Sequence, residues 1–280
     1  MRWVICTAMV LAFAPSAFAG DFDVLRGTQP TYNWGGFYFA GQIGYSTSVD
    51  NFSEATGSNV AFILRNTLIE QDENISSWQV LQSTRSTGSG NIGGFVGYNA
   101  QWQDIVLGLE ANYDRVSLTT ATAGSEERTF FDSKNLPANH NYFYDVNVSA
   151  QAMMQVTDIA TFRARAGVAV SNYLPYGFIG FAVGRASYSN TASVEYTAVD
   201  DPAITNPPTP PLPEMFFGPV AQGRSQDNVY LYGFSTGGGV DIGLARNIFL
   251  RGELEYIYFF PYDGIQVSVT SARVGVGLKF

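Results

Sequence analysis

The chain is poor in the residues that support disulfide-bonded, zinc-binding and ordinary soluble proteins. Its 280 residues include one cysteine, Cys6, and one histidine, His140. Neither an intramolecular disulfide framework nor a Cys/His zinc site is therefore available. Charged residues make up only 14% of the sequence, against roughly 25% in soluble domains. The formal net charge of −9 also argues against nucleic acid as a partner.

Long apolar runs are missing as well. The chain has a short apolar run over 4–13, preceded by Arg2 and followed by a small-x-small site that ends at Ala19. This order is typical of a secretory signal. No later apolar stretch reaches the ~18 residues of a transmembrane helix. An exported chain of this kind belongs to the periplasm, the medium, or a β-barrel in an outer membrane.

Aromatic residues and glycine are abundant instead, with 21 Phe, 16 Tyr, 4 Trp and 29 Gly. The last nine residues, 272–280, alternate between apolar residues and polar residues or glycine. Residues two apart in a β-strand share one face. Val274, Val276, Leu278 and Phe280 therefore form an apolar stripe, which would face lipid in a transmembrane barrel.

Eight segments show this alternation along the chain. They cover 36–45, 92–102, 105–113, 159–170, 174–186, 230–244, 248–258 and 272–280. Short turns alternate with three long connections, 46–91, 114–158 and 187–229. Together these features predict an all-β, eight-stranded antiparallel transmembrane β-barrel with short periplasmic turns and three long extracellular loops.

Alternation over 142–154, continuous in parity with Arg163, leaves two arrangements open for the second long connection. That segment either extends its hairpin beyond the membrane or adds a further hairpin, which would give ten strands. The third connection contains a proline-rich run over 206–213, which we expect to be extended and solvated.

The charges inside the predicted strands lie opposite the apolar stripe of the same strand. These residues are Glu110, Arg163, Arg165, Asp241, Arg251, Glu253, Glu255 and Arg273. Since the interior of an eight-stranded barrel is filled by side chains, we expect these acids and bases to pair and to plug the lumen. A narrow ion path is the alternative.

Aromatic residues flank the predicted strands at both ends, as at two membrane interfaces. The short-turn end carries Trp34, Trp102, Tyr173 and Phe280, and the long-loop end carries Tyr45, Tyr113, Tyr188, Tyr230 and Tyr258. In the fifth strand we expect Tyr176, Phe178 and Ala182 on the apolar face. A soluble β-sandwich would not need such girdles.

His140 is the one candidate for chemistry, in the second long connection near Asp145. A solvated loop histidine is the simplest interpretation. General-base catalysis at the rim and contact with haem, helped by the aromatic residues 142–144, are weaker alternatives. No motif marks a nucleophile and no metal-ligand spacing occurs, so we expect no enzyme activity, no cofactor and no metal.

Several motifs resemble one family. They are Asp23-Val24-Leu25-Arg26-Gly27, Asn33-Trp34-Gly35-Gly36-Phe37-Tyr38, the segments 161–167, 174–177 and 251–256, and the C-terminal 273–280. Together they resemble the small porin-like outer-membrane proteins of alphaproteobacteria, which include surface antigens and haemin-binding proteins and share the architecture of the OmpA membrane domain. The tripled glycine 237–239 and the proline-rich run depart from that pattern.

The resemblance implies a monomeric barrel in the cell outer membrane with both termini in the periplasm. It also implies that the stripe ending at Phe280 is read by the barrel-insertion machinery. We expect a signal peptide over 1–19, a periplasmic segment over 20–35 and the barrel over 36–280.

These features predict a structural, surface-presenting envelope protein. Its partners would be outer-membrane lipids and lipopolysaccharide, with a host or surface ligand reached through the loops. A narrow channel and a haemin or ligand receptor are the alternatives.

Overall fold

The computed structural model describes residues 32–81, 84–134, 136–137, 140–200 and 210–280. The predicted signal peptide and most of the predicted 20–35 segment lie outside these ranges. Eight strands form a closed barrel in chain order, and each strand pairs antiparallel with its neighbours. The strands are β1 Gly36–Asn51, β2 Arg85–Trp102, β3 Ile105–Asp132, β4 Tyr142–Val168, β5 Tyr173–Asp200, β6 Met215–Ala245, β7 Ile248–Phe259 and β8 Gln266–Lys279.

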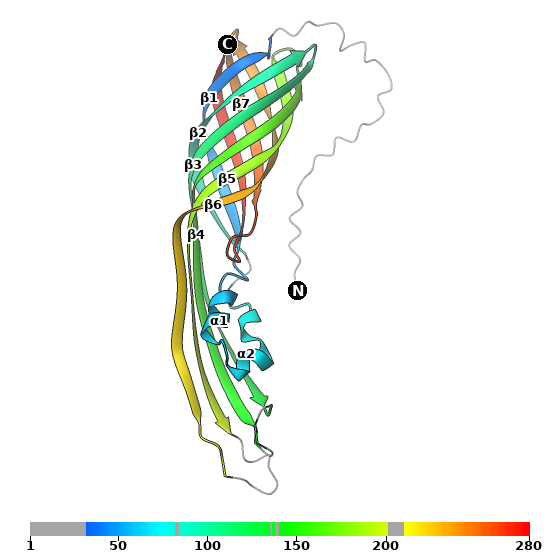
Figure 1. Ribbon diagram of the computed structural model, residues 1–280. Helices are drawn as coiled ribbons and strands as arrows, with labels where there is room; N and C mark the ends of the chain where they lie inside the picture. The colour runs from blue at the N-terminus through cyan, green and yellow to red at the C-terminus, as the bar shows by residue number, and fades with distance from the viewer. Residues whose placement is uncertain (1–31, 82–83, 135, 138–139, 201–209) are drawn as a thin grey trace, which may run out of the picture.

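The eight-stranded antiparallel fold is confirmed, but the strands are much longer than the alternation predicted. β3 to β6 continue past the barrel as a curved four-stranded sheet, which we call the extension (Figure 1). The pairs Asp132↔Tyr142 and Ala198↔Met215 lie near its far end. The second and third predicted loops, 114–158 and 187–229, are therefore mostly strand. Of the two arrangements left open, the extended hairpin is the one present, and the described strands number eight.

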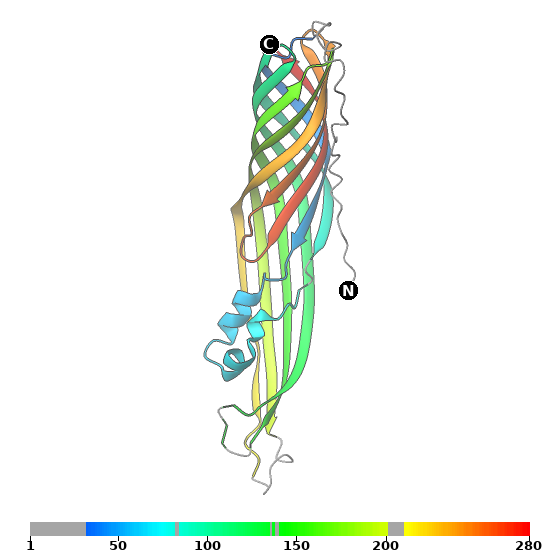
Figure 2. The ribbon, with the colours of Figure 1, turned by 90° about the vertical axis from the view of Figure 1, so that its right-hand side faces the viewer.

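Short helices from the first long connection cover one face of the extension (Figure 2). They are α1 Gly57–Ile63, α2 Leu68–Glu73 and the 3-10 helix Ile75–Ser77. No helix in the described ranges is long and apolar enough to cross a bilayer. Val60, Leu64 and Ile69 pack against inward side chains of β4 and β5 such as Val146 and Val194.

β4 changes which of its alternating residues point inward where the barrel becomes the extension. Val156 pairs with Ala186 and Asp158 with Arg185, so β4 uses two residues where β5 uses one. The extra residue, Thr157, is a β-bulge. The inward residues are odd-numbered within the barrel and even-numbered beyond it. The sequence indicated one continuous alternation through this point, which is wrong because a single inserted residue reverses a period of two.

The barrel interior is layered. At the short-turn end, Trp34 and Tyr32 pack with Phe249 and Leu174 in an apolar cluster. At the other end, Phe52 and Leu81 from the first connection join inward side chains of β3, β4 and β8 in a second apolar cluster. The charged residues lie on the strands between these two clusters.

Two expectations about the girdles are wrong. Trp34 and Tyr188 are buried inside the molecule. Trp34 is held there because its backbone N–H donates to Gln101 Oε1 (2.7 Å) and its carbonyl accepts from Asn99 Nδ2 (3.2 Å). The other girdle residues, apart from the half-buried Tyr258, are exposed on the outer surface.

Candidate functional site

The eight strand charges predicted to face the lumen all lie inside the barrel, and each is at most 4% exposed. They project from β3, β4, β6, β7 and β8, and they form one network of ion pairs. The network contains Glu110, Arg163, Arg165, Asp241, Arg251, Glu253, Glu255 and Arg273. We call it the charged belt.

Arg163 lies at the centre of the belt. Its Nη2 pairs with Glu110 Oε1 and its Nη1 lies 2.7 Å from Glu253 Oε1. Its guanidinium stands 4.2 Å from the centre of the Phe178 ring. Because β4 lies far from β7 around the barrel, the Arg163–Glu253 pair crosses the lumen and fills it.

The other three arginines complete the crossing. Arg251 contacts Asp241 Oδ1 through Nε (2.7 Å) and Glu110 Oε2 through Nη1 (2.6 Å). Arg165 pairs with the same Asp241 at 2.7 Å. Arg273 Nη2 lies 2.6 Å from Glu253 Oε1. Each carboxylate thus holds at least one guanidinium, which offsets the high cost of burying either charge alone.

Three belt members were not predicted. Asp114 pairs with Arg273, the Tyr38 hydroxyl donates to Glu110 Oε2 (2.8 Å), and the Tyr176 hydroxyl donates to Glu253 Oε2 (2.6 Å). Asp114 shares the inward parity of Glu110, so extending the predicted third strand by one residue would have found it. Tyr38 alternates with the exposed Phe37 and Phe39, so parity already places it on the inward face. Tyr176 carries no such signal, because it was assigned to the apolar stripe.

The predicted facing of the fifth strand is wrong. Tyr176, Phe178 and Ala182 point into the lumen, while Ile179 and Phe181 are exposed on the outside. Both faces of this strand are apolar, so alternation could not separate them. The inward rings have a specific use, because Arg165 lies 3.8 Å from the Tyr176 ring centre, within cation–π range.

The belt side chains pair with one another, and each of its carboxylates accepts a guanidinium or hydroxyl donor. In the described ranges no group of three or more His, Cys, Asp or Glu side chains is arranged to hold a metal ion.

His140 lies at the far end of the extension, and its partner is Asp200 rather than the sequence neighbour Asp145. His140 Nδ1 lies 2.6 Å from Asp200 Oδ2. Asp200 also accepts the backbone N–H groups of Leu212 (2.8 Å) and Asn141 (3.1 Å). The Leu212 hydrogen bond, helped by those from His140 and Asn141, lowers the pKa of Asp200. Asp200 therefore connects three chain segments through hydrogen bonds, and these bonds hold His140 in place.

The residues of the predicted insertion stripe lie on the outside of β8. Val274, Val276 and Leu278 are exposed, and Phe280 beyond the strand stacks on Phe39 with ring centres 5.6 Å apart. β8 pairs with β1, so this stripe borders the seam that closes the barrel.

Comparisons with known proteins agree with the barrel. The family model described as outer membrane protein beta-barrel domain matches residues 5–280. The chain belongs to this family. It is therefore an outer-membrane protein, and β1 to β8 form its transmembrane barrel.

Solved structures to which the chain is similar include those of two bacterial proteins. Ail, the attachment invasion locus protein of Yersinia pestis, is 13% identical, with 88% of this chain and 99% of Ail covered and a TM-score of 0.31. The Neisserial surface protein A is 12% identical, with 87% and 97% covered and a TM-score of 0.36. The search of curated proteins found no match.

Proposed function

We propose that this protein is a closed, non-enzymatic membrane anchor that presents the extension to the surroundings of the cell. One observation carries the proposal. β4 is charged inside and apolar outside within the barrel, and it is apolar inside and polar outside beyond Thr157. Beyond the membrane the same strand thus builds a water-exposed unit with its own core under α1 and α2. A barrel that only conducted ions would not need this second core.

Side chains fill the lumen of the barrel, which supports the role of an anchor rather than that of a channel. Trp34 occupies the short-turn end, the charged belt crosses the middle, and Phe52 and Leu81 belong to the apolar cluster at the outer end. We expect a silent planar bilayer, with folding checked by heat-modifiable gel mobility. Reproducible conductance steps that change in Glu253→Ala would replace the anchor with a narrow channel.

One edge of the extension is available to a partner. β6 pairs with β7 only from Gly233 onward, and above that point no described strand pairs with this side of β6. Side chains of Tyr262 and Asp263 reach Gln226 and Arg224, which leaves 215–223 open. An open strand edge offers unpaired backbone groups to an extended segment of another protein.

Adhesion of cells displaying the protein tests this role. We expect adhesion to a protein-coated surface, and we expect it to fall several-fold in Val220→Lys, because a lysine on an open edge blocks strand addition. Thr191→Lys, on neighbouring β5 away from the open edge, is the matched control. Equal adhesion of both variants and the parent would contradict contact through this edge.

Two finer assignments are secondary proposals: that the protein binds haemin, and that it is of the alphaproteobacterial surface-antigen type. For haem, the supporting feature is that Asp200 holds His140 Nδ1, which leaves Nε2 as the ligand atom. A Soret shift on haemin addition that disappears in His140→Ala would support it. Identical spectra for the two proteins would rule out this residue.

A further inference from the structure

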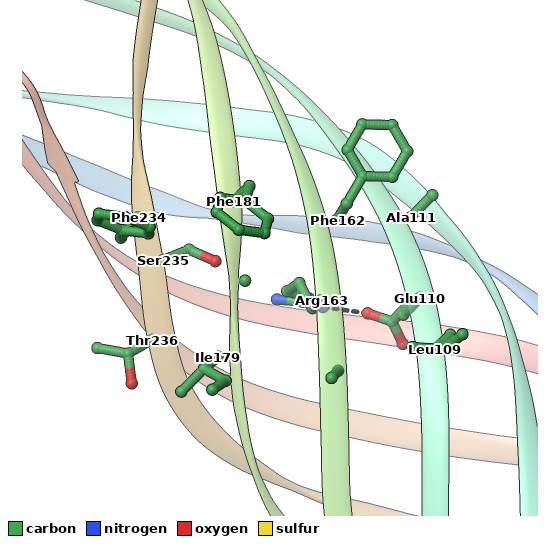
Figure 3. Close-up of a pocket in the computed structure, with 12 residues that line it drawn as sticks. Leu109, Glu110, Ala111, Phe162, Arg163, Ile179, Phe181, Phe234, Ser235 and Thr236 are labelled. Atoms are coloured by element: carbon green, nitrogen blue, oxygen red, sulfur yellow. Dashed lines mark hydrogen bonds and ion pairs between the residues drawn. The ribbon is translucent and has the colours of Figure 1, made fainter.

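The lipid-facing surface of the barrel is not uniform, and one large hollow lies over β3 to β6. This hollow has a volume of about 820 Å³. Figure 3 shows Phe162, Phe181 and Phe234 along one end, with Leu109 and Ile179 toward the other. These side chains are 50–70% exposed, so the hollow opens outward and not into the lumen.

A second hollow, of about 890 Å³, continues the first toward the periplasmic turns. The two share Leu109, Ala164, Ile179 and Thr236, so they form one groove. The floor of this second part is shallow because Ala166 on β4 pairs with Gly177 on β5, and Gly177 pairs with Gly238 on β6. The tripled glycine that departs from the family pattern thus contributes to this floor.

The lining of the groove suits a ligand without hydrogen-bonding groups. Arg163, Glu110 and Ser235 border the first hollow, but their side chains point into the lumen and are buried. The Thr236 hydroxyl already donates to the Phe178 carbonyl (3.2 Å). A hydrocarbon chain satisfies such a lining, whereas a polar partner would leave its own groups unpaired.

The two ends of the groove differ, and the difference gives the direction of the chain. The three phenylalanines lie on the extracellular side of Ala164, Ile179 and Thr236 along their own strands, and they close that end. The other end reaches Tyr98 and Ala100, close to the girdle residue Trp102 at the periplasmic interface. The groove thus opens toward the periplasmic leaflet and is continuous with the lipid interface.

We propose that this groove is a specific site for one acyl chain of a phospholipid in the periplasmic leaflet. The chain enters beside Tyr98, lies over Ala166 and Ala164, and ends against the three phenylalanines. Contacts with the groove walls then replace mobile neighbouring lipids along its length, so this chain exchanges more slowly than the rest of the lipid shell. The site is separate from the charged belt and from the extension.

Photocrosslinking in nanodiscs tests the site. The probe is a phosphatidylethanolamine with a diazirine at the end of one acyl chain. We expect crosslinked peptides to concentrate on those carrying Phe162, Phe181 and Phe234, and their yield to fall several-fold in Ala164→Leu, which fills the groove from the lipid side. Ala272→Leu is the matched control, because Ala272 also faces lipid but on β8. It should leave the yield unchanged.

Three results would overturn the proposal. Crosslinks spread around the barrel in proportion to exposed area would mean ordinary lipid contact. An unchanged yield in Ala164→Leu, with heat-modifiable mobility showing a folded barrel, would mean that the groove is not the site. A second probe with the diazirine beside the glycerol should label the peptide with Tyr98 and Ala100, and labelling at Phe234 instead would place the headgroup in the opposite leaflet.

Discussion

The barrel and the extension are made from the same strands but follow opposite burial rules. Within the bilayer, Arg163 and Arg165 point inward while Phe162 and Ala164 face lipid. Beyond Thr157, Met154 and Val156 point inward, and the residues that alternate with such inward residues along the extension are mostly polar, as Gln151 and Gln155 are. The solvent outside each region explains the exchange, because hydrocarbon rejects charge and water rejects apolar surface. The side of the sheet on which an apolar side chain lies is therefore set by the solvent around that part of the strand. One β-bulge is enough to let the same strand meet lipid in the barrel and water in the extension.

The largest effect should come from breaking the belt. Arg163→Ala leaves Glu110, Glu253 and Glu255 without their shared arginine in the buried interior of the barrel. We expect it to lower the free energy of unfolding by about 3–5 kcal/mol. Urea unfolding in detergent micelles, followed by tryptophan fluorescence, measures it. Arg128→Ala removes an exposed pair with Glu126 on the extension and should cost about 1 kcal/mol or less. Similar losses for the two variants would contradict the contrast between the regions.

Two adjacent methionines test the facing of the extension. Met154 is fully buried under the barrel mouth, whereas its neighbour Met153 is 39% exposed on the opposite face. Met154→Ala should cost about 2–5 kcal/mol because it leaves a cavity. Met153→Ala should stay within about 0.5 kcal/mol of the parent protein. The same unfolding titration compares them, and a reversed order would mean that β4 does not change its facing at Thr157.

A charge at an exposed strand position should matter only at lipid depth. Val274 lies on the lipid face of β8, beside the belt residue Arg273, and Val220 lies on the open edge of the extension. Val274→Arg should cost about 2–4 kcal/mol, and Val220→Arg about 0.5 kcal/mol or less. Refolding into liposomes measures both. An unchanged free energy for Val274→Arg would show that this position does not face hydrocarbon.

The smallest effect concerns a carboxyl group at the boundary between the regions. Asp50 lies near the outer end of β1, beyond the girdle residue Tyr45. Burial raises the pKa of Asp50, against the opposing hydrogen bonds from Ser48 and Thr120. A raised pKa means that folding favours the protonated form. The stability from this group is complete below the unfolded pKa and is lost as the pH rises through the folded pKa.

Replacing Asp50 by asparagine keeps an oxygen for the Ser48 hydroxyl but removes the buried charge. Asp50→Asn should therefore unfold at a higher urea concentration than the parent at neutral pH, and the difference should shrink on acidification. The urea midpoint of both proteins across pH 4 to 8 measures it. A difference that grows as the pH falls would show that the carboxylate is stabilised in the folded state.

Alternation was sufficient to predict the membrane part of the fold and the eight charged residues now seen in the belt. A charge in a lipid-crossing strand has only the lumen to face, so parity assigned Glu110 and Arg251 without any knowledge of the fold. Parity failed on β5, because both of its faces are apolar. It also could not reveal Tyr38 and Tyr176 as hydrogen-bond donors in the belt.

The length of the strands could not be predicted for a different reason. The bilayer fixes the minimum length of a strand but sets no upper limit once the strand reaches water. The segments beyond Tyr113 and Ala186 are polar enough to suggest loops, and only their pairing across β3, β4 and β5 identifies them as sheet. The insertion of Trp34 into the barrel depends on contacts with Gln101 and Asn99, which lie distant in sequence.

The bulge at Thr157 also limits how this gene product can change over time. On β4 the inward residues are even-numbered before Thr157 and odd-numbered after it. Losing or gaining one codon there would therefore move the side chains of one half of the strand to the opposite face. Either Arg163 and Arg165 would be driven into hydrocarbon or the core around Met154 would be driven into water. Related chains should therefore vary freely in amino acid at this position while keeping the count of residues between Met154 and Arg163 constant.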